Sequence, residues 1–334
     1  MSTAPTGNAR RVIAVVVLVP VIAALALWAF AWPAARTAPR DLPLGVAGPA
    51  AATAQVEKQL AQHEGAFELH RYRDEAAARE AIEDRTVYGA VVVTADGPTL
   101  LTASAASPVV AQLLQQAVAQ QAAADGAQVR TVDVVAAPAA DPRGAALNAS
   151  VLPLALAGMA AGAVVTFSGL RGTRAALVLV GASALVGVAA AGVADSWLGV
   201  ITGDWWAQAG VFGLAALAVS GAVAGLAALL GTPGVGIVAG VVMLFGNPWS
   251  GAASAPQMLP EPAGTIGQWL PPGASATLTR SVAYFDGAAA TGPALTLAWW
   301  AALGLGAVLL GSALKERKKN AGSGVTEREL APVG

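Results

Sequence analysis

The 334-residue sequence has no cysteine and only two histidines. The first absence excludes disulfides, thiolate nucleophiles and cysteine-ligated zinc or iron–sulfur sites. His63 and His70 have no third ligand at metal spacing, so we interpret them as surface residues and expect no metal site. The sequence also lacks Walker A, nucleophile-elbow and HExxH patterns. We therefore expect neither an enzyme nor a bound cofactor, and no ATP hydrolysis by the chain itself.

Charge is also scarce. Charged residues make up 12% of the chain, against about 25% in soluble domains. The net charge is -1, and no basic stripe with interleaved aromatics suggests a nucleic-acid partner. Hydrophobic residues account for 56% and the mean hydropathy is +0.61. This composition indicates that the partner of most of the chain is the lipid bilayer.

Six long apolar runs lack Asp, Glu, Lys, Arg and His. Five of them have the roughly 20 residues, at 1.5 Å each, that cross a hydrocarbon core of about 30 Å. Val235 to Asn247 is shorter and would span only with flanking residues. Helices of a soluble core show a polar face at helical period, and these runs show none. The sequence therefore predicts a polytopic α-helical membrane protein with six transmembrane helices, at 12–32, 148–170, 175–194, 208–230, 235–247 and 292–314.

The first apolar run, 12–32, has two interpretations. A cleaved signal peptide is one, with Ala29-Phe30-Ala31 as a cleavage site. However, the run is longer than the 7 to 15 apolar residues of such a peptide, and Trp28 and Trp32 suit a membrane–water interface. We interpret it as an uncleaved first helix.

Lys and Arg are unevenly distributed among the short connections. With the N-terminus inside, nine fall in inside segments, namely residues 1–11, the 171–174 hairpin and a basic tail at 315–334. Only Arg280 falls in a short outside loop. By the positive-inside rule, both termini are cytoplasmic, the protein is multi-pass in the cell (inner) membrane, and residues 33–147 lie outside.

Residues 33–147 show the pattern of a folded domain. A turn at Asp96-Gly97-Pro98 separates two strands, and a second turn, Asp141-Pro142-Arg143-Gly144, precedes the next membrane helix. Apolar alternation predicts strands at 42–47, 67–72, 87–93, 99–103 and 129–135, and helices at 50–63, 74–84 and 108–124. We expect an inserted extracytoplasmic α/β domain.

Within the membrane runs, small residues recur four apart. This spacing allows close helix approach, either as ordinary bundle packing or at a mobile or oligomeric interface. The expected packing pairs are Gly158 and Gly162, Gly221 and Gly225, and Gly236 and Gly240. Because the runs contain no ionisable residue, intrinsic proton coupling is disfavoured.

Residues 248–291 form a broken segment before the last run. Two short helices, 264–270 and 274–284, flank a Pro-Pro-Gly break, which favours a re-entrant or interfacial hairpin over an ordinary exposed loop. We expect Arg280 to meet an anionic head group or to pair with Glu261 or Asp286. The predicted outer gate or interface comprises Trp249, Trp269, Pro271, Pro272, Gly273, Arg280 and Tyr284.

The whole arrangement resembles ABC-2 type transporter permeases, especially the YhgE/Pip-like branch. The resemblance is carried by Asp74 to Val93, by Asp141 to Gly144, and by the stretch from Asn247 through Pro271-Pro272-Gly273 to Arg280. In that family, two six-helix permeases pair, and a separate ATPase drives export of lipids, drugs or peptides. Members that dock an ATPase carry an amphipathic N-terminal helix and a coupling helix after the second crossing, and this sequence has neither.

Two functions follow from these patterns. The first is a permease subunit of an ABC-2-like exporter, which would work with an ATP-binding subunit and a second permease as a homo- or heterodimer. The alternative is a non-transporting envelope protein whose external domain binds a partner or wall component. An ATPase associated with the protein would favour the first.

Overall fold

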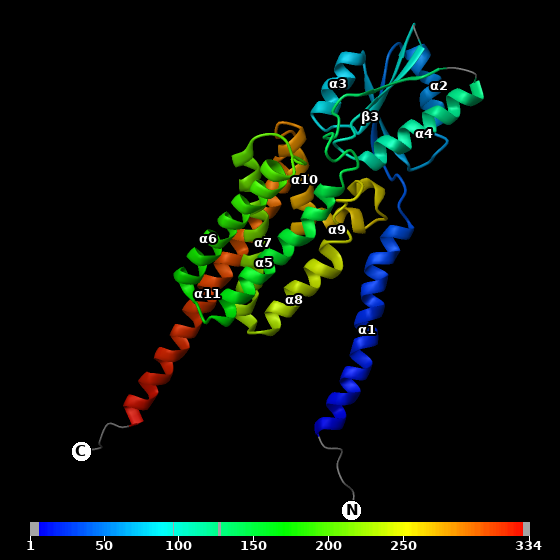
Figure 1. Ribbon diagram of the computed structural model, residues 1–334. Helices are drawn as coiled ribbons and strands as arrows, with labels where there is room; N and C mark the ends of the chain where they lie inside the picture. Colours follow the sequence, from blue (N-terminus) through cyan, green and yellow to red (C-terminus); the bar gives the residue numbers. More distant parts are fainter. Residues whose placement is uncertain (1–6, 96, 126–127, 330–334) are drawn as a thin grey trace, which may run out of the picture.

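The computed structural model describes residues 7–95, 97–125 and 128–329 (Figure 1). The described chain has three parts: a long helix α1, an α/β unit, and a helical bundle. The α/β unit lies at one end of the molecule. The first turn of α1 and the last turns of α11 both point to the opposite end (Figure 1).

Helix α7 (Trp205–Leu230) is the centre of the bundle. Helices α5 (Ala145–Phe167), α6 (Gly172–Ala191), α8 (Pro233–Val241) and α11 (Thr291–Glu329) all pack against it. Most buried residues of α7 are Ala, Gly, Val or Ser. Such small side chains let four neighbouring backbones approach one helix closely, which is how helices associate without a hydrophobic driving force.

Five helices in the described part of the chain are long and apolar enough to cross a membrane. They are Ala9–Ala35, Ala145–Phe167, Gly172–Trp197, Trp205–Leu230 and Thr291–Arg317. They correspond to five of the six predicted crossings and support a polytopic membrane protein.

The remaining predicted crossing, 235–247, is a shorter apolar helix, Pro233–Gly246. It consists of α8 and a π-helical turn, η2 (Val242–Gly246). Its fourteen residues extend about 21 Å, which is less than the roughly 30 Å of a hydrocarbon core. A π-helical turn also ends α6, as η1 (Gly192–Trp197).

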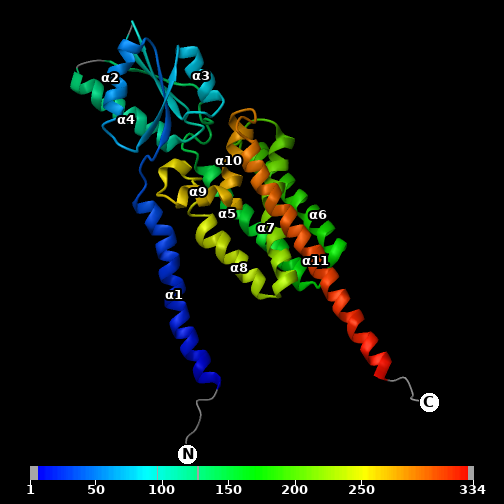
Figure 2. The same cartoon turned by 180° about the vertical axis from the view of Figure 1, so that it is seen from behind.

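Helix α1 (Gly7–Ala35) stands apart from the bundle in both ribbon views (Figures 1 and 2). Only 6% of its apolar span is buried, against 67% for α7. At the other end of the chain, α11 continues as helix to Glu329, so the predicted tail is helical up to that residue, and residues 330–334 lie outside the described part.

The α/β unit contains a five-stranded sheet in the order β2-β1-β3-β4-β5. β1 pairs in parallel with β2 and β3, β3 pairs antiparallel with β4, and β4 pairs in parallel with β5. The strands are β1 (Leu42–Ala47), β2 (Phe67–Tyr72), β3 (Gly89–Thr94), β4 (Gly97–Thr102) and β5 (Arg130–Asp133).

Helices cover both faces of this sheet. Apolar side chains of α3 (Glu75–Glu83) pack with Leu101 on one face, while those of α2 (Ala50–Leu60) and α4 (Pro108–Asp125) pack with Leu100 on the other. Neighbouring residues of a strand point to opposite faces, so β4 contributes to both cores.

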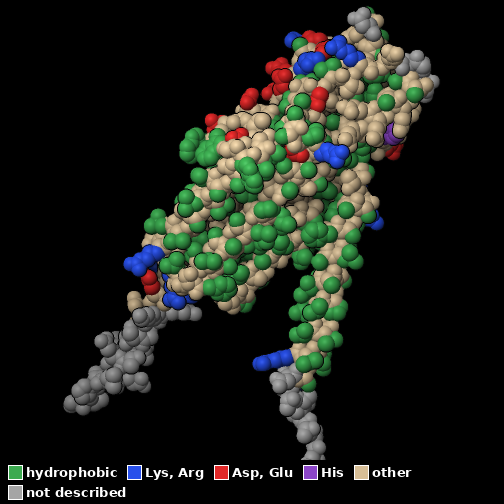
Figure 3. Space-filling model, viewed as in Figure 1, with side chains coloured by type: hydrophobic (Ala, Val, Ile, Leu, Met, Phe, Trp, Pro, Cys, Tyr) green, Lys and Arg blue, Asp and Glu red, His purple; other side chains and the backbone are tan. Residues whose placement is uncertain are grey.

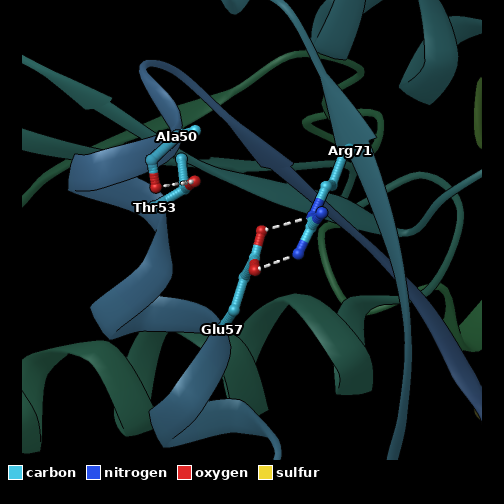
Figure 4. A network of polar contacts seen from close by, with 4 residues as sticks. All are labelled: Ala50, Thr53, Glu57 and Arg71. Carbon is cyan, nitrogen blue, oxygen red and sulfur yellow. Dashed lines mark hydrogen bonds and ion pairs between the residues drawn. The ribbon is translucent and has the colours of Figure 1, made fainter.

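Helix α2 is also held by a polar contact (Figure 4). Glu57 accepts two hydrogen bonds from Arg71 of β2, at 2.7 and 2.6 Å, and one turn earlier Thr53 donates to the carbonyl of Ala50. The two-pronged geometry fixes the direction of the helix over the sheet edge. Asp74 caps α3 by accepting from the backbone N–H of Ala77 at 2.9 Å.

Strand and helix positions in this unit follow the sequence pattern closely. The observed bounds of β1 and β2 are those predicted, and the other six elements differ by a few residues at their ends. Asp96 of the predicted turn lies outside the described residues. Its neighbour Gly97 has φ +112° and starts β4, a conformation that glycine adopts without strain.

Candidate functional site

Between α8 and α11 the chain folds back onto the bundle. This return segment, residues 247–290, contains a short 3-10 turn η3 (Pro256–Met258) and helices α9 (Ala263–Trp269) and α10 (Pro271–Tyr284). Eleven of the fourteen residues of α10 are buried, and α10 packs against α5, α7 and α11. An ordinary exposed loop would leave most of these residues in solvent. The return segment is therefore part of the bundle.

The Pro-Pro-Gly sequence has a different place from the one expected. Pro271 and Pro272 begin α10 instead of separating it from the preceding helix, because proline is well suited to the first helical turn, where the backbone N–H has no partner. Gly273 follows within the same turn. The break between α9 and α10 consists of Leu270 alone, in extended conformation.

Two glycines hold three backbone segments together here. A Cβ on Gly273 would lie 2.1 Å from the carbonyl oxygen of Gly267, and a Cβ on Gly267 would lie 1.7 Å from that of Trp249. Neither position has room for a side chain unless the backbone moves. The backbone of α9 therefore lies in close contact with α10 on one side and with the start of the return segment on the other.

Arg280 is buried on α10. Its guanidinium donates to the backbone carbonyls of Gly251 and Ala252 within the return segment. The ion pairs among the described residues do not include the expected partners: Glu261 instead accepts from Thr265 at 3.0 Å. These hydrogen bonds from Arg280 therefore hold the loop before η3 against α10.

A second arginine, Arg85, also contacts α10, although the sequence run Glu80, Glu83, Asp84 and Arg85 is by itself most simply a solvated helix face. Arg85 follows α3 in the α/β unit and donates to the carbonyl of Thr277 at 3.0 Å and to the hydroxyl of Ser281. Its guanidinium carbon lies 5.2 Å from the centre of the Phe285 ring, in cation–π geometry. Burial lowers the pKa of Arg85. The only sequence signal was a lone basic residue after an acidic helix.

Apolar contacts reinforce this junction. Ala255 and Met258 of the return segment belong to one core of the α/β unit, and Phe285 belongs to the other. Tyr88 of the loop before β3 donates to the Gln257 side chain at 2.9 Å, and burial raises the pKa of this tyrosine. The α/β unit and the return segment therefore share their cores.

Trp249 links the return segment to α1. Its indole N–H donates to the carbonyl of Ala29 at 3.1 Å. Its ring lies within 6.2 Å of Trp28 and Trp32 on α1 and 5.0 Å from Phe245. These aromatic contacts attach α1 at the end near the α/β unit, while the rest of the helix stays separate.

The other two predicted aromatic residues lie apart from Trp249. Tyr284 is partly buried and donates to the carbonyl of Val200 at 3.1 Å, so it joins α10 to the connection after η1. Trp269 is 72% exposed at the end of α9. Its carbonyl accepts from the indole N–H of Trp300 on α11 at 2.8 Å, which fixes α9 against that helix.

A lateral groove opens beside Trp269. It has a volume of about 540 Å³ and runs between α8 and α11, which lie on either side of α7 (Figure 2). Ala222 and Leu226 of α7 form its floor, Val238 of α8 one wall, and α11 from Thr296 to Ala307 the other, with Trp269 and Leu270 across one end. No charged residue lines it, so the lateral groove suits an apolar ligand.

The predicted glycine pairs differ in what they contact. Gly158 and Gly162 meet the carbonyls of Ala216 and Ser220 on α7, and Gly225 meets that of Gly304 on α11. A Cβ on Gly221 would find α11 at ordinary contact distance. A Cβ on Gly236 or Gly240 would have no neighbouring atom within 4 Å, so among the described residues they mediate no packing inside the chain. Their spacing resembled that of the others, but the face of α8 that carries them is open.

Most charged side chains in the space-filling view lie away from the apolar helices (Figure 3). Green apolar side chains cover the bundle and α1, while acidic and basic ones gather on the α/β unit and at the opposite end. The described residues include no group of three His, Cys, Asp or Glu side chains that would hold a metal.

Taken together, the apolar spans and the buried return segment describe a polytopic membrane protein. Residues 10–170, from α1 through α5, match the family model described as ABC-2 family transporter protein. No curated protein and no solved structure matches the chain. Residues 10–170 are therefore similar to that family, and the apolar helices support a multi-pass membrane protein.

Proposed function

We propose that the chain is the membrane permease subunit of an ABC-2-like exporter of the YhgE/Pip-like branch. It crosses the cell membrane six times, with α8 and η2 as the shortened crossing. Residues 33–147 are outside and both termini are cytoplasmic. It moves a lipid, drug or peptide-like substrate outward, driven by a separate ATPase and paired with a second permease.

The distribution of basic residues supports this orientation. Arg10 and Arg11 are at the start of α1, and Arg171 and Arg174 lie at the short connection between α5 and α6. Lys315 lines a pocket with Arg171, so the inner part of α11 lies beside that connection. The start of α1, the connection between α5 and α6, and the inner part of α11 lie at the end opposite the α/β unit (Figure 1), which fits the positive-inside rule.

The single observation that carries the proposal is the buried return segment beside a lateral groove. Non-helical backbone at membrane depth is tolerated where protein covers it or where it lines a cavity. Here Trp269 and Leu270 of the return segment close one end of the groove. In our proposal the groove admits the substrate from the bilayer, and α9 and α10 form the outer gate.

Coupling to an ATPase would use the inner ends of the helices. The connection from Phe167 to Gly172 is too short to form a coupling helix. The ATPase would instead contact this connection together with α11, which extends as helix beyond the Thr291–Arg317 span.

The test is purification of the full chain from its own membranes, followed by measurement of associated ATP hydrolysis in vesicles. We expect an ATP-binding protein to co-purify, and its activity to fall several-fold when Gly273→Ala displaces α10. Gly236→Ala, whose added methyl group meets open space, should leave the activity unchanged. A chain that purifies without ATPase activity would instead favour a non-transporting envelope protein.

A further inference from the structure

The lateral groove has the length of one lipid chain. Along α11 it extends from Thr296 to Ala307, which at 1.5 Å per residue is roughly 16 Å. That is about half of a hydrocarbon core of roughly 30 Å, the depth that one leaflet contributes. The groove begins beside Trp269 and Trp299, whose side chains are 72% and 64% exposed.

Its width suits a lipid chain. The volume of about 540 Å³ extends along roughly 16 Å of α11, an average cross-section of about 34 Å². Carbon atoms in van der Waals contact are only about 4 Å apart, so an extended polymethylene chain fits.

The lining excludes a polar occupant. Two hydrogen-bond donors of the lining are already bonded within the protein. Thr296 donates to the carbonyl of Gly292 at 3.2 Å, and the indole N–H of Trp300 donates to the carbonyl of Trp269 at 2.8 Å. A hydroxyl, amide or charge buried in the groove would lose its hydrogen bonds to water without replacement. The exposed indoles of Trp269 and Trp299, by contrast, suit the level of lipid head groups.

We infer that the lateral groove is a binding site for one acyl chain of an outer-leaflet phospholipid, with the head group beside Trp269 and Trp299. This site rests on the membrane placement in the proposed function, but not on transport. A lipid held there would fill the space that α8 and α11 leave open over α7. It would also contact α9 directly, so its binding and the position of the return segment are linked.

The test uses a photoreactive side chain, which forms a covalent bond with whatever occupies the groove. Benzoylphenylalanine replaces Leu303 in the groove, which is 64% exposed, or Leu185 on the outer face of α6, which is 70% exposed. Both positions lie about twelve residues into their helices. The full chain is reconstituted in dioleoyl phosphatidylethanolamine and phosphatidylglycerol, extracted into detergent, washed and irradiated.

We expect the Leu303 variant to gain the mass of one phospholipid, with at least fivefold higher yield than the Leu185 variant. Filling the groove by Leu226→Trp should reduce the Leu303 adduct at least fivefold, and Leu185→Trp should not. Thr296→Trp fills the other end and serves if the first filled variant fails to give a monodisperse protein.

Three results would overturn the site: equal adduct yields at the two positions, no lipid adduct at Leu303, or cross-linking of Leu303 to a second copy of the chain. The last would make the groove a helix–helix interface. An adduct at Leu303 in a protein that associates with no ATPase would leave the lipid site intact and remove the proposed exporter function.

Discussion

Arg85 of the α/β unit donates a hydrogen bond of 3.0 Å to the carbonyl oxygen of Thr277 in α10. The two residues are 192 positions apart in the chain, and the same guanidinium also binds Ser281 and lies over Phe285. Arg85 therefore attaches the α/β unit to the helix that we propose as the outer gate. Movement of either part must carry the other or break this contact.

Removing this contact should loosen the junction. We expect Arg85→Ala to destabilise the protein by about 1.5–3 kcal/mol, the range for hydrogen bonds to charged groups, and to lower the apparent melting temperature in detergent. Arg79→Ala is the control, since its partly exposed pair with Glu75, one helical turn away at 2.7 Å, should contribute only about 0.3–0.5 kcal/mol. Similar melting temperatures for the two variants would show that Arg85 does not hold the junction.

The stacked glycines of the return segment predict a sharp difference between two alanine substitutions. Gly273→Ala places a methyl group 2.1 Å from the carbonyl oxygen of Gly267, so α10 must shift, and we expect a loss of about 1–3 kcal/mol, typical of overpacking. Gly236→Ala meets no atom within 4 Å and should gain up to about 1 kcal/mol from helix propensity. Thermal unfolding monitored by tryptophan fluorescence compares them. Equal stability would mean that the three backbones are not tightly stacked.

Trp249 should control the position of α1. Because the helix is attached by the Trp249 hydrogen bond to Ala29 and by ring contacts, Trp249→Leu should free its inner part. The chain has no native cysteine, so spin labels at Val16→Cys on α1 and Ile237→Cys on α8 report their separation directly. We expect a broader distance distribution in Trp249→Leu, and no change in Trp197→Leu, whose side chain is 78% exposed. An unchanged distribution in the first variant would contradict an aromatic attachment.

The proposed orientation can be measured with single cysteines. Glu64→Cys lies in the exposed loop between α2 and β2, and Arg174→Cys lies at the opposite end, in the first turn of α6. In intact cells, a membrane-impermeant maleimide should label the first and not the second. Permeabilised cells should show labelling at both positions. Labelling of Arg174→Cys without permeabilisation would reverse the proposed topology.

Local patterns account for the parts of the structure that were predicted well. Alternation and capping in the α/β unit depend on near neighbours in sequence, which is why β1 and β2 have their predicted bounds and Asp74 caps α3. The charge-free runs likewise predict long apolar helices, because a helix satisfies its backbone hydrogen bonds internally whatever surrounds it.

The candidate site was predicted only in outline. Pro271 and Gly273 are in a tightly packed part of the return segment, but as the first turn of α10 and not as a break. Arg280 bonds to backbone carbonyls of its own segment and not to the acidic residues near it in sequence. The first difference follows from the preference of proline for the first turn of a helix. The second arises because Gly251 and Ala252 come from a chain segment brought close by folding.

The sequence by itself therefore determined a membrane protein with long apolar helices and an α/β unit between the first and second of them, since composition, period and caps act over a few residues. Only the tertiary structure decided which glycines pack, that Gly236 and Gly240 face open space, and that Arg85 reaches α10. A glycine pair or a single arginine looks the same in the sequence whether or not the folded chain places a partner opposite it. The partner is fixed by packing of the whole chain around α7, and that packing creates the lateral groove.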